Sequence, residues 1–195
     1  SPSTTTFERV ADINPGPPNS DPAYFANFNG QLFLRATGNN NAGAELWRYD
    51  PTTKLPSIAD DINPGPTGSD PAHLASYNGA LYFRANGGDG NGAELWRWNG
   101  SDSGRVAEIN AGAADANPAY LTVFNNFLYF SATGSEGKGN ELWRTDGTST
   151  QLIADINGSG DSNPSYLAVF NNALYFSAVS TDGKGVELYK FDGTT

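Results

Sequence analysis

The strongest constraint on this chain is one short sequence motif, here called the repeated word, which occurs four times. Glu-Leu-Trp or Glu-Leu-Tyr begins at four glutamates spaced about 47 residues apart: Glu45, Glu94, Glu141 and Glu187. Every unit also contains an acid-Ile-Asn step, an Asp-Pro or Asn-Pro step, and a turn that begins at Asn29, Asn78, Asn125 or Asn171. A unit of this length is one supersecondary element, so the sequence predicts a stack of similar units that bury a shared core.

The composition agrees with a single repeat array. No change in composition separates the copies within the 195 residues, so we expect one domain over residues 7–195, preceded by a linker at residues 1–6. Aromatic side chains make up 12% of the chain and supply the large apolar surfaces that a core requires. The 23 glycines and 12 prolines fall at fixed phases of the unit, where they indicate turns rather than disorder.

Charge and hydropathy argue against several classes of partner. The formal net charge is −10, the wrong sign for holding a phosphate backbone, so we expect no nucleic-acid partner. No run approaches the roughly 18 apolar residues of a membrane-spanning helix, and we expect neither a membrane span nor a signal peptide in this sequence. The chain has no cysteine, which excludes disulfides, thiolate catalysis and zinc-thiolate sites.

The third copy shows how one unit is expected to fold. Residues 119–124 and 127–132 predict two strands joined by the tight turn Asn125-Asn126, and residues 141–144 and 151–156 predict a third and a fourth strand. Both faces of the second strand are apolar, because Phe127 and Tyr129 alternate with Leu128 and Phe130. A sheet of this kind must be covered on both sides.

Four antiparallel sheets covered by identical neighbours predict an all-β fold, a four-bladed β-propeller. The blades are expected at about residues 23–62, 72–109, 119–156 and 165–193. The fourth unit lacks its last strand, and residues 7–13 match that strand, so we expect the N-terminal strand to close the ring beside residues 187–190. A β-helix or flat solenoid is the alternative fold, and a dimer that shares eight blades is the structural rival of a monomeric ring.

The signature Glu-Leu-Trp-Arg-Thr-Asp-Gly-Thr at residues 141–148, with Ala-Asp-Ile-Asn and Asn-Pro-Ser-Tyr-Leu, resembles the ELWxxDGT repeats of bacterial secreted and surface proteins. The resemblance covers the chain from Phe7 onward, and it departs from the motif at Asp50-Pro51, at residues 99–101 and at Tyr189. It implies an extracellular or cell-surface location and a repeat-built binding or structural module. It supplies no catalytic or ligand residue that could be transferred to this sequence.

Catalytic chemistry has weak candidates in this sequence. His73 is the only histidine, and it stands where the other copies have tyrosine, which favours an aromatic exchange over a Ser-His-Asp triad. Paired acids could hydrolyse a glycosidic bond. However, an acid that recurs in every unit is more simply a structural hydrogen-bond acceptor. The recurring acids form two sets, namely the four glutamates of the repeated word and Asp12, Asp61, Glu108 and Asp155.

Short loops rich in oxygen ligands precede the repeated word. Loops of this kind can hold Ca²⁺, which is therefore the candidate metal. Its candidate ligands are Asp89, Asn91 and Asp182. None of the loops matches the twelve-residue calcium loop, and two of them contain lysine, so ordinary turns are the competing interpretation. No other cofactor is expected.

The candidate ligand site lies where the Asp/Asn-Pro loops enter the inner strands. An acid or amide stands beside an aromatic ring in every copy, and this combination can hold a sugar by hydrogen bonds and stacking. The candidate residues are Asp21, Tyr24, Asp70, His73, Asn117, Tyr120, Asn163 and Tyr166. The competing interpretation is that the Asp or Asn residue caps its loop and the aromatic ring fills the channel. Trp98 is a further candidate, because the repeat does not require it and we expect its ring to be partly exposed.

Three functions follow from these observations. The leading hypothesis is a non-enzymatic extracellular module that recognises a carbohydrate or a cell-surface protein through repeated weak sites. The alternative is an architectural or adhesive domain of a larger surface protein. The third is a carboxylate-dependent glycoside hydrolase.

Overall fold

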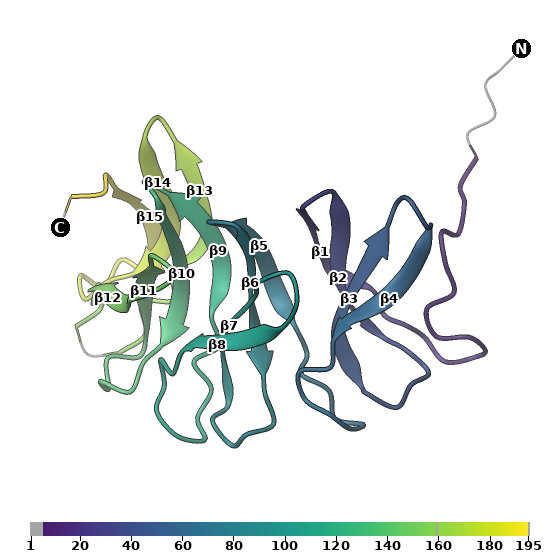
Figure 1. Ribbon diagram of the computed structural model, residues 1–195. Helices are drawn as coiled ribbons and strands as arrows, with labels where there is room; N and C mark the ends of the chain where they lie inside the picture. The colour runs from purple at the N-terminus through teal and green to yellow at the C-terminus, as the bar shows by residue number, and fades with distance from the viewer. Residues whose placement is uncertain (1–5, 159, 195) are drawn as a thin grey trace, which may run out of the picture.

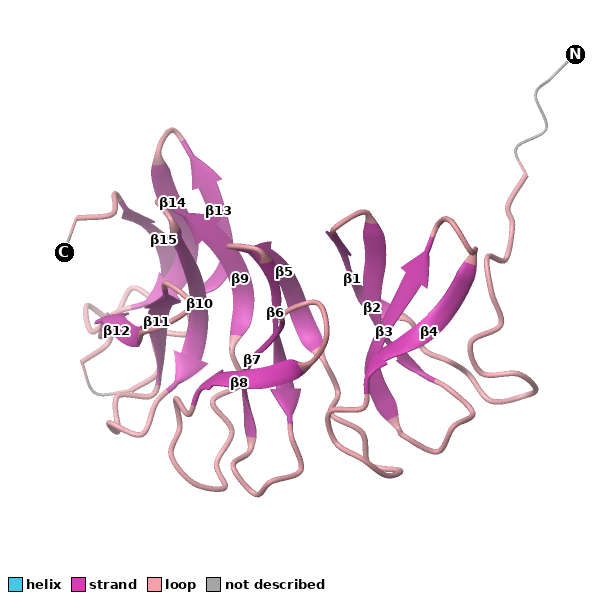
Figure 2. Ribbon diagram, in the orientation of Figure 1, coloured by secondary structure: helices cyan, strands magenta, loops and turns pink. Residues whose placement is uncertain are grey.

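The computed structural model describes residues 6–158 and 160–194, so most of the expected linker at residues 1–6 lies outside the described part of the chain. The described residues form strands and loops without any helix, and hence no helix that could cross a membrane. The strands make four antiparallel sheets in chain order (Figures 1 and 2). We call these sheets blades 1 to 4.

Three blades have four strands each and the last has three. Blade 1 contains β1 (Ala23–Phe28), β2 (Gln31–Thr37), β3 (Ala44–Asp50) and β4 (Leu55–Asp60). Blade 2 contains β5 (Ala72–Tyr77), β6 (Ala80–Asn86), β7 (Ala93–Trp98) and β8 (Ser103–Ala107). Blade 3 contains β9 (Ala119–Phe124), β10 (Phe127–Thr133), β11 (Asn140–Thr145) and β12 (Thr150–Ala154). Blade 4 has three strands, β13 (Ser165–Phe170), β14 (Ala173–Val179) and β15 (Val186–Phe191).

The predicted hairpin turns are confirmed. In blade 3, Phe124 pairs with Phe127, so that Asn125 and Asn126 alone form the loop. Their φ angles are 45° and 61°, the left-handed values that a two-residue turn of type I′ requires at both positions. Asparagine tolerates this conformation, which explains why Asn-Gly or Asn-Asn stands at this turn in every copy.

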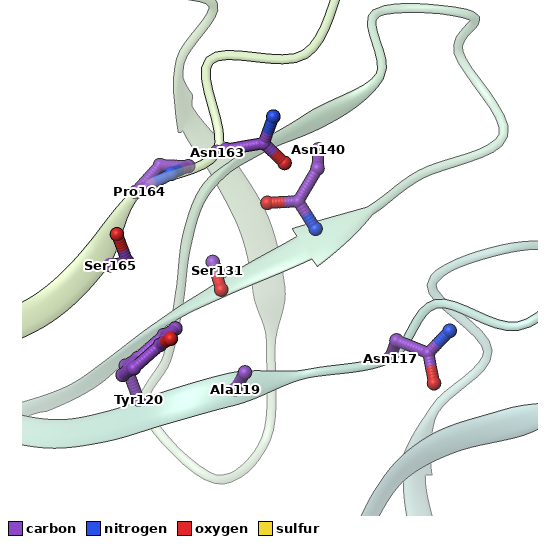
Figure 3. Close-up of a pocket in the computed structure, with 8 residues that line it drawn as sticks. All are labelled: Asn117, Ala119, Tyr120, Ser131, Asn140, Asn163, Pro164 and Ser165. Atoms are coloured by element: carbon purple, nitrogen blue, oxygen red, sulfur yellow. The ribbon is translucent and has the colours of Figure 1, made fainter. Parts of the chain in front are cut away.

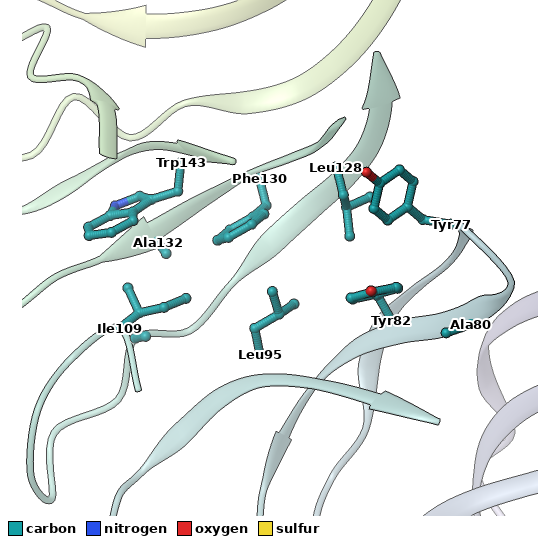
Figure 4. Packing of buried hydrophobic residues seen from close by; sticks show 10 residues of the cluster. Tyr77, Ala80, Tyr82, Leu95, Ile109, Leu128, Phe130, Ala132 and Trp143 are labelled. Atoms are coloured by element: carbon teal, nitrogen blue, oxygen red, sulfur yellow. The ribbon is translucent and has the colours of Figure 1, made fainter. Parts of the chain in front are cut away.

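The hydrophobic core lies between consecutive blades. The inner strands β1, β5, β9 and β13 are neighbours in that order, and the four sheets are arranged side by side (Figure 1). Between blades 2 and 3, Tyr82 and Leu95 face Leu128 and Phe130, and all four side chains are at most 1% exposed (Figure 4). Each blade therefore stabilises the next by burying large apolar side chains.

The tryptophan of the repeated word packs within these cores and against a glycine of its own blade. A Cβ added to Gly134 would lie 2.4 Å from an atom of the Trp143 ring. The same separation is found for Gly38 with Trp47 and for Gly87 with Trp96. In the fourth copy serine replaces this glycine and Tyr189 replaces the tryptophan, so the smaller ring accompanies the larger partner. The sequence changes in blade 4 thus compensate each other.

The glutamate of the repeated word is a structural hydrogen-bond acceptor in blades 1 to 3, as the simpler interpretation of the sequence predicted. Glu45 is fully buried and accepts four hydrogen bonds. They come from the backbone N–H groups of Ile62, Asn63 and Ser69, at 3.0, 3.3 and 2.7 Å, and from the Ser69 hydroxyl at 2.5 Å. Glu94 and Glu141 are also fully buried and bind the corresponding loops. We call this arrangement the glutamate clamp; it joins each of these blades to the loop that leads to the next blade.

The ring is open in this structure, in contrast to the predicted closure. Residues 6–22 form no strand, and β15 pairs only with β14. Ile13 packs against Leu34, Ala36 and Trp47 of blade 1, which keeps the N-terminal segment at that end of the array. Consequently Glu187 is exposed and Leu188 is 76% exposed, whereas the equivalent Leu46 of blade 1 is fully buried.

Candidate functional site

The loops that enter the inner strands share an unusual backbone conformation. The aromatic residues Tyr24, His73, Tyr120 and Tyr166 have φ angles between 54° and 57°. The four acids or amides three residues earlier have φ angles between 43° and 48°. Left-handed backbone at residues other than glycine costs on the order of 1–3 kcal/mol each, and it concentrates at functional sites. The register of each first strand pair also shifts at this position, so the aromatic side chain leaves the regular alternation of its strand.

This conformation brings four aromatic rings into one row. The ring centroids of Tyr24 and His73 lie 5.4 Å apart, those of His73 and Tyr120 lie 5.6 Å apart, and those of Tyr120 and Tyr166 lie 5.3 Å apart. Successive rings are tilted by 47° to 53°. We call this row the ring ladder. The structure thus brings together the predicted aromatic residues of all four blades.

The ring ladder is open to solvent at its ends. Tyr24 is 45% exposed and Tyr166 is 76% exposed, while the two middle rings are half-buried. The expectation that these rings nearly fill a channel is therefore wrong for the two terminal rings, because the open ring leaves each without a neighbour on one side. Exposed rings can stack on a sugar or a peptide, whereas rings that fill a channel cannot.

Two equivalent cavities lie beside the ladder. The first, of about 290 Å³, lies between blades 3 and 4 and is lined by Asn117, Tyr120, Ser131 and Asn163 among others (Figure 3). The second, of about 400 Å³, occupies the same position between blades 1 and 2 and is lined by Ala23, Tyr24, Arg35, Asp70, Ala72 and Arg84. Repetition of the cavity follows from repetition of the strands that form it.

The acid and amide side chains of the site do not cap their loops. The backbone N–H of Asp70, Asn117 and Asn163 donates to the carbonyl oxygens of Ala44, Ala93 and Asn140, so the backbone itself holds these loops. Within the described residues, the side chains of Asn117 and Asn163 make no hydrogen bond, and both are exposed. These amides are therefore free to bind a ligand. Asp70 differs, since Arg35 donates to its carboxylate from Nε at 3.1 Å and from a terminal nitrogen at 2.8 Å.

His73 occupies the ladder position that tyrosine fills in the other blades. Its Nδ1 accepts a 3.5 Å hydrogen bond from the backbone N–H of Tyr120. Burial, and to a lesser degree the nearby Arg84 guanidinium, hold the pKa of His73 below its ordinary value. The imidazole is therefore neutral at physiological pH and contributes an aromatic face. This placement agrees with the aromatic exchange that the sequence indicated.

Two of the candidate calcium ligands, Asp89 and Asp182, already have partners. Asp89 accepts from the backbone N–H of Asn91 at 3.1 Å and pairs with Arg105 at 2.9 Å. Asp182 accepts from the backbone N–H of Lys184 at 3.1 Å, and the Lys184 ammonium lies 3.7 Å from the same carboxylate. Among residues 6–158 and 160–194, no group of three or more acidic or histidine side chains is placed to hold a metal ion.

The expected exposure of Trp98 is wrong. Trp98 is 4% exposed and lies in the core between blades 1 and 2, where its ring centroid is 4.9 Å from that of Phe33 and 6.0 Å from that of Phe28. The last position of the third strand faces the preceding blade, so a larger ring there extends the core instead of the surface. Trp98 is unable to stack on a ligand from this position.

Sequence reasoning missed two arginines of the site. Arg35 and Arg84 occupy the same position of the second strand in blades 1 and 2, where blades 3 and 4 have Ser131 and Ser177. Both arginines line the cavity between blades 1 and 2. Comparison of the four copies could have singled them out, because a cation in only two copies of an otherwise apolar strand departs from the pattern of the core.

Known proteins provide a fold and no family. The chain matches no family model and no curated protein sequence. Among solved structures, it resembles a prolyl endopeptidase with a TM-score of 0.61 and 11% identity, over 98% of this chain and 30% of that chain. It also resembles the β-propeller domain of the Trilobed protease from Pyrococcus furiosus, with a TM-score of 0.52 and 12% identity, over 89% of this chain and 53% of that chain.

The fold is that of a β-propeller. The chain spans about half of the Pyrococcus propeller domain and less than a third of the prolyl endopeptidase. At these identities the likeness concerns the arrangement of the blades alone. The function of this propeller must therefore be argued from its own site residues.

Proposed function

We propose that this propeller is a non-enzymatic binding module that holds a carbohydrate along its ring ladder. The observation that carries the proposal is the row of four rings with neighbouring unbonded amides. Aromatic faces stack on the apolar face of a sugar ring, and amides bond its hydroxyl groups. Equivalent positions in successive blades suit a polymer whose own units repeat, since several weak contacts then act together.

The backbone strain of the ladder supports a binding role. Strain persists only where the surrounding structure enforces it, and here it recurs at the four aromatic residues of the same site. A core ring could be accommodated on a regular strand without this cost. The strained bulge instead brings the rings of all four blades into one row.

Non-enzymatic binding is favoured over glycoside hydrolysis by the use made of the repeated acids. A glycosidase needs two carboxyl groups at the cleaved bond, about 5–10 Å apart. Glu45, Glu94 and Glu141 are buried in the glutamate clamp instead. In the cavities beside the ladder, the acid of the site is Asp70, which is paired with Arg35.

The proposal includes an extracellular location, which the resemblance to the ELWxxDGT repeats suggests, and a monomeric propeller closed into a ring of four blades. Closure is supported by complementary ends. Glu187 has no hydrogen-bond partner among the described residues, and the first unit contains Ile13, Asn14 and Ser20 at the positions that the clamp binds in later units. Pairing of residues 7–13 with β15 would bring these groups together.

A glycan array with paired variants tests the binding function. Asn117→Gly combined with Asn163→Gly should abolish glycan capture and leave the melting temperature within about 2 °C, because exposed amides without bonds contribute little to stability and glycine adopts the left-handed φ of 48° found at both positions. Asn171→Ala, in a hairpin turn away from the ladder, is not a suitable control, since its left-handed φ of 46° would be strained. Asp192→Asn, near the C-terminal end, is the matched control and should bind as the native protein does.

Two outcomes of this experiment contradict the proposal. If no glycan on the array binds the native protein, the carbohydrate function is wrong and the architectural alternative is favoured. If the double variant unfolds, the amides hold the loops and the site is structural. Turnover of a bound oligosaccharide, followed by reducing-end release, would instead establish the glycosidase alternative.

A further inference from the structure

Arg84 differs from every other arginine that the structure describes. Its side chain makes no hydrogen bond, ion pair or ring contact within residues 6–158 and 160–194, and its Nε is buried. The other six arginines each have a partner: Arg9 with Asp12, Arg35 with Asp70, Arg48 with Ser57, Arg97 with Gly147, Arg105 with Asp89, and Arg144 with Tyr129 and Phe127. A guanidinium with a buried donor and no partner is costly to maintain in a folded protein.

The repeat explains why this cation lacks a partner. In the preceding blade, Arg35 occupies the same position, and it binds Asp70 in the loop that enters the next blade. For Arg84, the equivalent position in the loop that enters blade 3 is occupied by Asn117. The acid has become an amide, while the arginine has been kept. Copy 3 shows the neutral solution, since it has Ser131 in place of arginine and the corresponding residue of the next copy is Asn163.

The cavity between blades 1 and 2 therefore carries one positive charge in excess. Arg35 and Arg84 both line it, and Asp70 balances only Arg35. The net charge of −10 belongs to the whole surface and acts diffusely. Salt at physiological strength screens such a field over about 8 Å, so the nearest charges decide which ion binds. Tyr24 of the ring ladder lines the same cavity.

We propose that Arg84 binds the anionic group of an acidic saccharide, a carboxylate or a sulfate, while the ring ladder stacks on the sugar that bears it. This inference rests on the proposed carbohydrate function and names the class of its ligand. The planar guanidinium matches an oxyanion with two parallel hydrogen bonds. A neutral His73 leaves Arg84 as the cation that selects the charge.

The substitution Asn117→Asp tests this inference without removing the arginine. It restores the acid of the preceding blade, so Arg84 should form the ion pair that Arg35 forms with Asp70. Binding of an acidic saccharide should then fall at least tenfold, and the melting temperature should stay the same or rise. Arg84→Gln should weaken binding by a similar factor. The charge-matched control Arg48→Gln, which changes an arginine of β3 bonded to Ser57, should bind as the native protein does.

The probes are tetramers of a uronic acid, the methyl esters of the same tetramers, and an O-sulfated neutral tetramer, each measured by calorimetry. Preference for the uronate or the sulfated tetramer identifies the anion. Equal affinity for the acid and its ester in every variant would overturn the role of Arg84 and leave the carbohydrate function standing. Unchanged affinity for the acidic probes in Asn117→Asp would also overturn it.

A second readout separates the two proposals. The side-chain Nε resonance of Arg84, assigned in labelled protein by its loss in Arg84→Gln, should shift on titration with a monomeric uronate. A shift without binding of any tetramer would support the anion site and contradict the carbohydrate function. No shift in the monomer titration, together with binding of neutral tetramers, would support the function and contradict the anion site.

Discussion

The glutamate clamp makes opposite predictions for two copies of the same residue. Glu45→Ala removes an acceptor that is fully buried and holds three backbone N–H groups and one hydroxyl. Each buried donor left without a partner costs about 1–3 kcal/mol. Release of the carboxyl from its own burial offsets part of this loss. We therefore expect Glu45→Ala to lower the free energy of unfolding by roughly 3–5 kcal/mol.

Glu187→Ala is the matched variant at the open end of the array. Glu187 is exposed and has no hydrogen bond among the described residues, so the structure predicts a change within about 0.5 kcal/mol. Equilibrium urea denaturation of both variants, followed by tryptophan fluorescence, measures the two values under one condition. Both proteins should keep the native dependence on urea concentration if the unfolding stays cooperative.

Two results would refute this reasoning in different ways. A small effect of Glu45→Ala would show that the clamp contributes little and that the repeated glutamate needs another explanation. A large effect of Glu187→Ala would show that this residue has a clamp in solution, and the loop at residues 13–20 is the one that could supply it. The second result would establish the closed ring of four blades, which stays a prediction until then.

Further predictions concern packing, pH and metal. Gly134→Ala places a Cβ about 2.4 Å from the Trp143 ring and should cost about 1–3 kcal/mol in urea denaturation, whereas Ser180→Ala beside Tyr189 should be nearly neutral. Burial raises the pKa of Glu45 and Glu94 to about 7, so their folded forms favour the proton. Their contribution to stability is present below about pH 4.5 and is lost as the pH rises through 7, and the melting temperature should be higher at pH 5.5 than at pH 8. Because Asp89 and Asp182 already pair with Arg105 and Lys184, neither excess chelator nor added Ca²⁺ should shift the melting temperature at physiological ionic strength, and a rise with Ca²⁺ would restore the calcium hypothesis.

The fold could be predicted from the sequence because each unit contains the residues that define its own turns and strands. The Asn-Gly and Asn-Asn turns define the hairpins, and the alternation in residues such as Phe127 to Phe130 predicts sheets covered on both faces. The closure of the ring by the N-terminal strand could not be predicted in the same way, for a physical reason. Whether residues 7–13 pair with β15 or stay near blade 1 depends on the balance between distant contacts, and no local pattern reports that balance.

The site was readable in part. The pairing of an acid or amide with an aromatic ring in every copy identified the ring ladder. Its left-handed backbone was hidden, since tyrosine and histidine do not signal a positive φ. Trp98 was misjudged because a residue that departs from the repeat was taken to be free of the core, whereas its strand position faces the preceding blade.

Departures between copies separate structural from functional residues when their partners are considered too. The fourth copy replaces both members of the pair Gly134 and Trp143, so that the larger Ser180 accompanies the smaller ring of Tyr189. The change from Asp70 to Asn117 has no such compensation, because Arg84 retains its charge and loses its acid. Repair would require only a serine, which two other copies have. An unrepaired cost at one position, beside a strained row of rings, is what a binding site imposes on a repeat that would otherwise be uniform.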